Sequence, residues 1–131
     1  MTPILLDTNI IVDVLRRRKD ARLALENLLS HDSPLASCAI TITEVYAGIR
    51  PHEEKSTRAF LDSLVFLPIT EEIAEHAGQL KAHYGKRGTV LSLQDVTIAA
   101  VSMAYGCTLV TQNIKDFPMP ELQIYPFSQA A

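Results

Sequence analysis

Cysteine is scarce in this sequence, which excludes the protein classes that depend on it. The only two cysteines, Cys38 and Cys107, lie in the apolar runs LASCAI and YGCTLV. Apolar neighbours favour buried, reduced thiols. Two cysteines make neither a disulfide framework nor a zinc site.

A surplus of basic residues and a long apolar run are also missing. The net charge is −3, since 15 Asp and Glu outnumber 12 Lys and Arg. Any nucleic-acid binding must therefore come from a local basic patch. No apolar run reaches the ~20 residues that span a bilayer, and no signal-peptide pattern opens the chain. We expect a cytoplasmic protein without a membrane partner.

The size and composition fit one globular domain. The chain has 131 residues, of which 47% are hydrophobic and 21% are charged. It shows no internal repeat, low-complexity segment or linker. We therefore predict a single domain over residues 1–131, with a core of about residues 3–125 and a frayed C-terminal tail.

Strand-like and helix-like patterns alternate along the chain. Strands are predicted over residues 3–6, 35–39, 65–69, 107–110 and 122–125, the last at a sheet edge. Helices are predicted over residues 8–17, 20–30, 41–49, 53–64, 70–83 and 92–106, and loops over GKRGTV and TQNIKDFPMP. Thr70 and Ser92 are the predicted caps of the last two helices, and Gly106 is the predicted stop of the last one. This alternation predicts an α/β fold, with a mostly parallel central sheet between two layers of helices.

Acidic side chains cluster near the ends of the predicted strands. Asp7 follows the first strand, and Glu44 and Asp95 each lie one turn into a helix. Asn113 and Asp116 follow the fourth strand. Parallel sheets bind ligands at the carboxyl ends of their strands. Carboxylates that converge there repel one another, so they call for a divalent cation, and all-oxygen ligation favours Mg²⁺ or Mn²⁺.

Each of these residues also has a purely structural interpretation. Thr41 with Glu44, and Ser92 with Asp95, fit the capping-box pattern at a helix start. Asp7 fits a helix cap, and Asn113 and Asp116 fit turn positions. Asp13 is interpreted as a polar-face residue of the first helix.

Read together, three segments resemble one family. LLDTNIIVDVL, ITITEVYAGI and LSLQDVTIAAVSMAYGCTLVTQNIKDF occur in this order. They are similar to the PIN-domain family over about residues 3–117. More narrowly, they resemble the VapC-like toxin ribonucleases of bacterial type II toxin–antitoxin pairs. No single segment carries the resemblance, which rests on the ordered set.

The resemblance implies cleavage of RNA by a carboxylate cluster that holds Mg²⁺ or Mn²⁺. By position, the acidic site comprises Asp7, Glu44, Asp95 and Asp116. Asp7 and Asp95 are the expected direct ligands, and Glu44 binds metal or positions water. Asn113 is a weaker ligand, because it offers only a neutral oxygen. The expected supporting residues, by hydrogen bonds, are Thr8, Asn9 and Thr111.

The resemblance also implies partners. We expect a cognate antitoxin, an RNA substrate, a homodimer and a toxin–antitoxin hetero-oligomer. Ile42, Val45, Tyr46 and the helix over residues 53–64 are the expected dimer contacts. The candidate phosphate contacts are Arg16, Arg17, Lys86, Arg87 and Lys115.

Two alternatives without nuclease activity stay open at this point. A receiver-like regulatory domain also has an acidic Mg²⁺ pocket. That pocket requires a pair of acids after the first strand, whereas here Asp7 is followed by Thr8. A PIN-like module could instead act only through a protein partner, with its acids serving as helix caps. Metal-dependent nuclease activity separates the enzyme from both.

Overall fold

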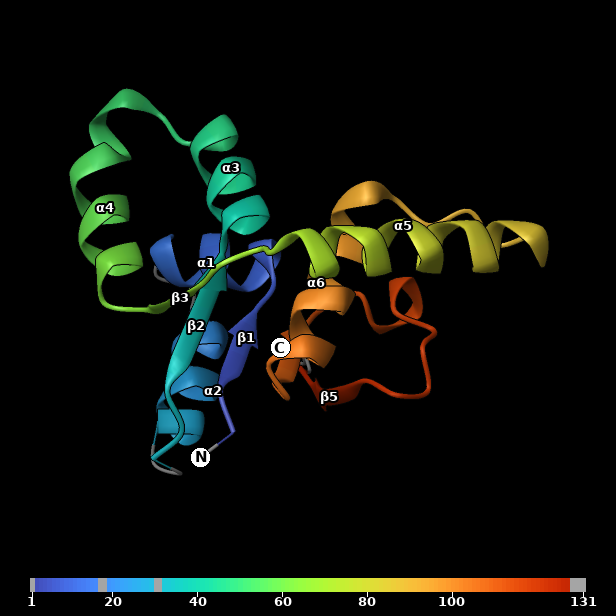
Figure 1. Ribbon diagram of the computed structural model, residues 1–131. Helices are drawn as coiled ribbons and strands as arrows, with labels where there is room; N and C mark the ends of the chain where they lie inside the picture. The colour runs from blue at the N-terminus through green and yellow to red at the C-terminus, as the bar shows by residue number, and fades with distance from the viewer. Residues whose placement is uncertain (1, 17–18, 30–31, 128–131) are drawn as a thin grey trace.

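The structure is a computed structural model that describes residues 2–16, 19–29 and 32–127 (Figure 1). The strands are β1 (Ile4–Leu6), β2 (Leu35–Cys38), β3 (Val65–Leu67), β4 (Thr108–Thr111) and β5 (Gln123–Pro126). The helices are α1 (Thr8–Leu15), α2 (Lys19–Leu29), α3 (Ala39–Gly48), α4 (Glu54–Asp62), α5 (Glu71–Lys86) and α6 (Leu93–Ala104). Short 3₁₀ helices are η1 (Pro51–Glu53) and η2 (Ile114–Asp116). Of the tail predicted after about residue 125, Pro126 ends β5 and Phe127 is buried, whereas residues 128–131 lie outside the described residues.

The strands form one five-stranded parallel sheet in the order β3-β2-β1-β4-β5. β1 is central, with Ile4 opposite Leu35 of β2 on one side and opposite Thr108 of β4 on the other. The chain moves outward from β1 to β3 and then returns to β4. The strand order therefore reverses between β1 and β4, where a parallel sheet opens a crevice.

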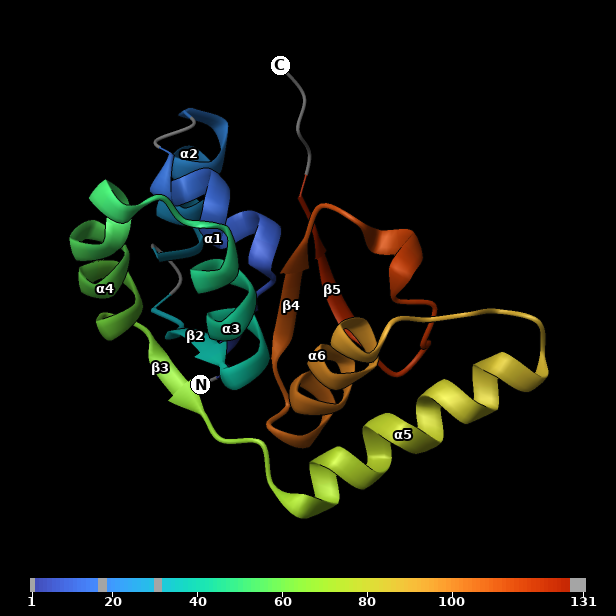
Figure 2. The same cartoon turned by 90° about the horizontal axis from the view of Figure 1, so that it is seen from above.

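Helices cover both faces of the sheet, as the alternating pattern predicted. Ile4 and Leu6 of β1 enter the hydrophobic core that α1, α2 and α4 help to form. Leu5 between them enters the core formed with α5 and α6. This period of two is the geometry of a strand buried on both faces. Figure 2 shows the sheet between the α1, α2 and α4 group and the α5 and α6 pair.

Several predicted helix boundaries were wrong by one to three residues, among them those of α3 and α5. α3 begins at Ala39, two residues before the predicted start, with Cys38 as its N-cap. α5 begins after the predicted cap Thr70 but continues to Lys86, beyond the predicted end at residue 83. Gly85 and Lys86, predicted in a loop, are therefore helical. The turn comes at Gly88, whose φ of +86° suits glycine.

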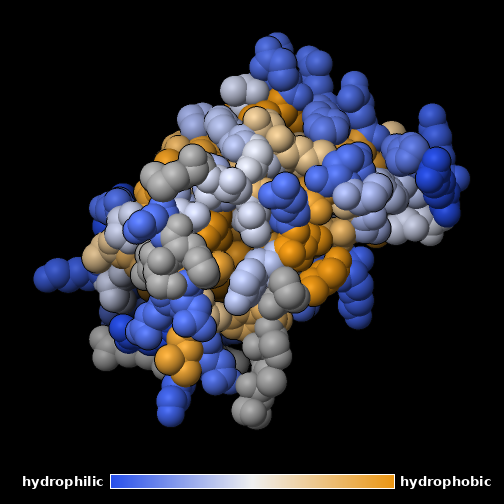
Figure 3. All heavy atoms as spheres, turned by 90° about the horizontal axis from the view of Figure 1, so that it is seen from below, coloured by the Kyte–Doolittle hydropathy of each residue, from blue (hydrophilic) through white to orange (hydrophobic). Residues whose placement is uncertain are grey.

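The predicted helix over residues 53–64 is α4, which runs from Glu54 to Asp62 and is preceded by η1. Pro51 opens η1, where its missing N–H costs nothing. No helix among the described residues is long and apolar enough to cross a membrane. Seen from below (Figure 3), polar and apolar side chains are interspersed over the surface.

Candidate functional site

An acid-lined cavity of about 330 Å³ lies where β1 ends. The cavity draws side chains from α1, α3, α6 and the segment after β4. Its lining residues are Asp7, Thr8, Asn9, Val12, Asp13, Glu44, Asp95 and Asn113. Residues that are distant in the sequence therefore meet at the crevice expected from the strand order.

Asp7 is at once a helix cap and a wall of this cavity. It is the N-cap of α1, and its Oδ1 accepts a hydrogen bond from the backbone N–H of Thr8 at 2.8 Å. Its Oδ2 accepts from the Thr111 hydroxyl at 2.7 Å and from the Asn9 amide at 3.4 Å. The capping interpretation and the site interpretation are therefore compatible.

The charge of Asp7 is only partly compensated. Its side chain is 6% exposed, and burial raises the pKa of this carboxyl above its ordinary value of 3.8. Hydrogen bonds from Thr111 and Thr8 lower the pKa, but the charges of Glu44 and Asp116 raise it again. Asp7 thus lies in a position where a bound cation would stabilise its charged form.

Glu44 lies in α3 and does not cap a helix. The start of α3 is capped through Thr41, whose hydroxyl accepts from the Cys38 N–H at 3.2 Å and lies 2.8 Å from the Cys38 carbonyl. The Oε1 of Glu44 instead accepts a hydrogen bond from the Thr8 hydroxyl at 2.7 Å. The capping-box interpretation of Thr41 and Glu44 is therefore wrong, because the helix begins two residues earlier than predicted.

Asp95 lies in the first turn of α6. The Ser92 hydroxyl caps this helix by accepting from the Asp95 N–H at 3.0 Å. Burial raises the pKa of the Asp95 carboxyl, the Ser92 hydroxyl lowers it, and the charges of Asp116, Asp7 and Glu44 raise it. The backbone of Asp95 serves the cap, while its carboxylate belongs to the acidic cavity.

Asn113 and Asp116 differ in their positions. Asn113 lines the cavity, and its backbone N–H donates to the Thr111 hydroxyl at 3.0 Å. Asp116 ends η2 outside the cavity lining, but its charge raises the pKa of both Asp7 and Asp95. The segment after β4 thus places the neutral side-chain oxygen of Asn113 in the cavity wall and the carboxylate of Asp116 next to the cavity.

The donor set fits a hard divalent cation. Within the described ranges, no three Asp, Glu, His or Cys side chains converge closely enough to enclose a metal ion as they stand. Mg²⁺ does not need such a cage, because it keeps several waters and binds proteins through one or two carboxylates. An acid-lined cavity with two raised carboxyl pKa values is consistent with this kind of hydrated ion.

The sequence interpretation missed two polar side chains at this site. Asp13, taken for a polar-face residue, lines the cavity, and its carboxylate accepts a hydrogen bond from the Gln112 side-chain amide. One signal was available for Asp13. It follows Asn9 by four residues, so both lie on the same face of α1. No local signal marks Gln112, whose contact depends on the strand order.

The predicted phosphate contacts lie in several places. Arg16 is the exposed C-cap of α1, and Lys115 is exposed in η2 beside Asp116. Lys86 and Arg87 are exposed at the end of α5, which projects from the body of the molecule (Figure 1). Arg17 lies outside the described residues. Lys115 is thus the candidate cation nearest in sequence to an acid of the site.

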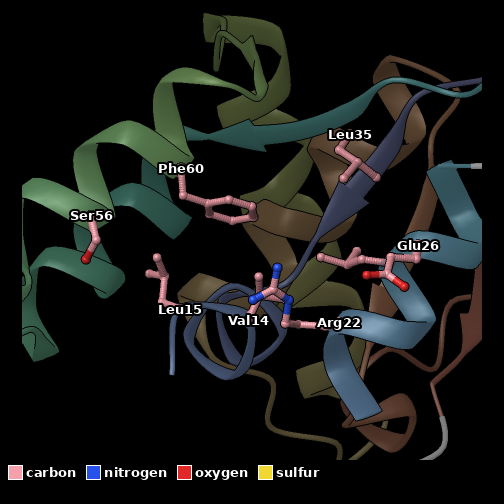
Figure 4. Close-up of a pocket in the computed structure, with 8 residues that line it drawn as sticks. Val14, Leu15, Arg22, Glu26, Leu35, Ser56 and Phe60 are labelled. Carbon is pink, nitrogen blue, oxygen red and sulfur yellow. The ribbon is translucent and has the colours of Figure 1, made fainter. Parts of the chain in front are cut away.

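A second, mostly apolar groove lies on the α1, α2 and α4 side of the sheet (Figure 4). It measures about 380 Å³. Its lining residues are Val14, Leu15, Arg22, Leu25, Glu26, Leu35, Ser56 and Phe60. In the close-up, Phe60 of α4 and Leu15 of α1 border one side of the groove. Apolar concave surfaces of this kind are typical of binding sites.

Comparison with known proteins identifies the family. The profile of the family described as "PIN domain" matches residues 4–118. Ribonuclease VapC19 of Mycobacterium tuberculosis is 33% identical over 120 residues, which cover 91% of this chain and 96% of the relative.

Two solved structures are similar in fold. A toxin–antitoxin complex from Klebsiella pneumoniae contains a chain that is 32% identical, with a TM-score of 0.79 and coverage of 95% of this chain and 98% of that one. A chain of VapBC2 from Rickettsia felis, bound to a promoter DNA fragment, has a TM-score of 0.85 at 23% identity and covers 97% and 100%. The chain therefore belongs to the PIN-domain family, as one of its VapC-like members.

Proposed function

We propose that this protein is a metal-dependent endoribonuclease that acts as the toxin of a toxin–antitoxin pair in the cytoplasm. The observation that carries the proposal is the acid-lined cavity where β1 ends, with raised pKa values at Asp7 and Asp95. The ribonuclease name of the VapC19 relative supports RNA as the substrate. Membership of the PIN-domain family also removes the receiver-like alternative.

Asp7 and Asp95 are the proposed direct ligands of Mg²⁺ or Mn²⁺. Glu44 and Asp116 complete the negative charge, either directly or through water, and Asn113 offers a neutral oxygen. A metal ion held there would lower the pKa of its bound water and stabilise charge on the phosphate being cleaved. The acids hold this cation against an anionic substrate that they would otherwise repel.

The neighbouring hydroxyl and amide groups orient the acids. Thr111 and Asn9 donate to one oxygen of Asp7, and Thr8 donates to Glu44. Partners of this kind fix the direction of a metal ligand. Lys115, with Arg16, Arg17, Lys86 and Arg87, is proposed to bind RNA phosphates, which predicts salt-dependent affinity.

A cognate antitoxin is the proposed protein partner. The solved structures similar to this chain include toxin–antitoxin complexes. The apolar groove between α1, α2 and α4 offers such a partner a surface to bury. A basic segment of the antitoxin would complement the acidic cavity when no metal is bound.

A homodimer, also able to enter a toxin–antitoxin hetero-oligomer, is the proposed assembly. One of the predicted contacts needs correction, because Val45 is 1% exposed and packs in the core. Ile42 and Tyr46 are only partly buried, so they stay candidates together with α4. Light scattering of the antitoxin-free protein at micromolar concentration should give twice the chain mass, and a monomer would contradict the proposal.

The decisive variant is Asp95→Asn, which keeps the size of the side chain and removes its charge. A capping role alone would cost about 1 kcal/mol of stability and leave cleavage intact. A metal-ligand role predicts the reverse. Stability without metal is held or raised, because repulsion is relieved, and RNA cleavage falls by about 100-fold or more.

The assay uses antitoxin-free protein and structured RNA, with Mg²⁺ or Mn²⁺ against EDTA. Asp62→Asn is the matched control, because Asp62 is exposed at the end of α4. Full activity of Asp95→Asn, or equal cleavage in EDTA, would refute the metal-dependent mechanism. The remaining alternative, a module that acts only through its partner, predicts no metal-dependent cleavage by the unchanged protein.

A further inference from the structure

The segment that follows β4 is fastened to α1 by side chains that the proposed catalytic set does not include. The Gln112 amide group donates to the carboxylate of Asp13. The backbone N–H of Gln112 lies 3.4 Å from the Asn9 side-chain oxygen, which accepts from it. The Asn9 amide nitrogen in turn donates to Asp7 at 3.4 Å. Gln112 thus makes hydrogen bonds to two successive turns of α1, to Asn9 in one and to Asp13 in the next.

We propose that Gln112 is a positioning residue, and that its contact with Asp13 braces the segment 111–116 against α1 so that the acids of the site keep their relative positions. The role in metal binding rests on the proposed function, whereas the brace itself does not. Asp13 is assigned here as the anchor of the brace, although it lines the cavity with the other acids.

Repulsion between the acids acts against the position that this contact holds. The charge of Asp116 raises the pKa of Asp7 and Asp95. These like charges therefore repel η2 from the start of α1 and from α6. The far end of the segment is anchored by Phe117 and Met119, which are buried in the core. The near end begins at Thr111, whose hydroxyl donates to Asp7. Between these anchors, Ile114 and Lys115 are exposed.

The amide of Gln112 suits this task because it is neutral. It satisfies the Asp13 carboxylate without bringing another charge into the site. It also joins residues 99 positions apart, so it sets the distance between two elements rather than the shape of one. A carboxylate in place of this amide would face Asp13 as a like charge and open the brace.

A reversal of the pair tests the brace. Gln112→Glu puts two carboxylates in contact, and Asp13→Asn removes the charged acceptor. The double variant Asp13→Asn with Gln112→Glu lets an asparagine amide donate to a glutamate, with the same side-chain lengths and total charge as the natural pair. Gln79→Glu, on the exposed surface of α5, is the control for the added charge.

Two measurements on antitoxin-free protein separate the brace from the proposed function. Hydrogen exchange in EDTA follows the amides of Gln112 and Asn113, both hydrogen-bonded in this segment. Electron paramagnetic resonance follows the binding of Mn²⁺. We expect Gln112→Glu to speed exchange at both amides and to weaken Mn²⁺ binding by about 10- to 100-fold, the usual effect of losing an outer partner of a metal ligand.

The double variant should restore slow exchange and recover most of the Mn²⁺ affinity, while Gln79→Glu should change neither. Unchanged exchange in Gln112→Glu, or a double variant as impaired as the single one, would overturn the brace. If the natural protein binds no Mn²⁺, the proposed function fails, and hydrogen exchange still decides for or against the brace.

Discussion

A single carboxylate, Asp7, combines a structural and a chemical task. It caps α1 through one oxygen and receives Thr111 and Asn9 on the other. Because the side chain is buried, each of these donors offsets part of its desolvation. The number of donors around Asp7 therefore controls how strongly the metal-free protein is destabilised by this charge.

We predict that Thr111→Val lowers stability and makes it more sensitive to pH. Thr111 is 0% exposed, and its hydroxyl donates to Asp7 and accepts from the Asn113 N–H. Loss of this hydroxyl leaves both groups without that partner, which should cost about 1–3 kcal/mol in urea unfolding at pH 7 with EDTA.

The sign of the pH effect follows from Asp7. Its folded pKa already lies above the ordinary value of 3.8, so its contribution to stability is fully present below that value and is lost as pH rises through the folded pKa. Without the Thr111 hydroxyl the folded pKa rises further. The deficit of Thr111→Val should therefore shrink as pH falls toward 4.

Thr43→Val is the control for Thr111→Val, because it removes a threonine hydroxyl at an exposed position of α3. That hydroxyl donates to the Ala39 carbonyl. Its effect should stay within about 0.5 kcal/mol and be independent of pH. An equal pH response of the two variants would show that the Thr111 hydroxyl does not act through Asp7.

At the scale of elements, α6 connects the two halves of the site. The helix carries Asp95 in its first turn and leads into β4, which ends at Thr111. The junction is Gly106, whose φ of +63° ends the helix and turns the chain into the strand. This left-handed conformation is the usual helix stop of a glycine, as the sequence predicted.

We predict that Gly106→Ala destabilises the protein by about 1 kcal/mol, because a Cβ is strained at this φ. No atom lies within 4 Å of the added Cβ, so the cost comes from the backbone and not from a clash. Thermal unfolding measures the loss. RNA cleavage at a temperature well below unfolding should be unchanged, and a large loss of cleavage would instead place the junction in the catalytic geometry.

For the whole molecule, the groove and the acidic cavity are separate surfaces that share α1. The cavity is lined from Asp7 to Asp13, and the groove begins at Val14 and Leu15. The two surfaces can therefore be altered independently. That separation allows a variant that affects the partner without affecting catalysis.

Ser56→Arg tests the groove as the antitoxin surface. Ser56 is exposed on α4 and lines the groove, so a long charged side chain should fill it without disturbing the core. We expect the variant to cleave RNA normally but to need about tenfold more of its co-expressed antitoxin for inhibition, a change of roughly 1.4 kcal/mol.

Ser63→Arg is the control, because Ser63 is the exposed C-cap of the same helix. Inhibition that is equally strong against both variants and the natural protein would exclude the groove as the antitoxin site.

Much of the architecture was predictable because it depends on local sequence patterns. The apolar period of β1, the cap residues Thr70 and Ser92, and the glycine stop at Gly106 each act within a few neighbouring residues. Boundaries were less predictable where a local motif had a competitor, as at α3, where Cys38 rather than Thr41 is the cap. The positions of the acids, either just after a strand or one turn into a helix, came from the same local reasoning.

By itself, the sequence determined the order of strands and helices, the positions of the acids along the chain and the resemblance to one family. Only the tertiary structure decided which side chains touch. Thr8 meets Glu44 across 36 positions, Gln112 meets Asp13 across 99, and Thr111 meets Asp7 across 104. The physical reason is that these contacts depend on strand order and register. A hydrophobic period specifies which face of a strand is buried, but not which strand lies beside it.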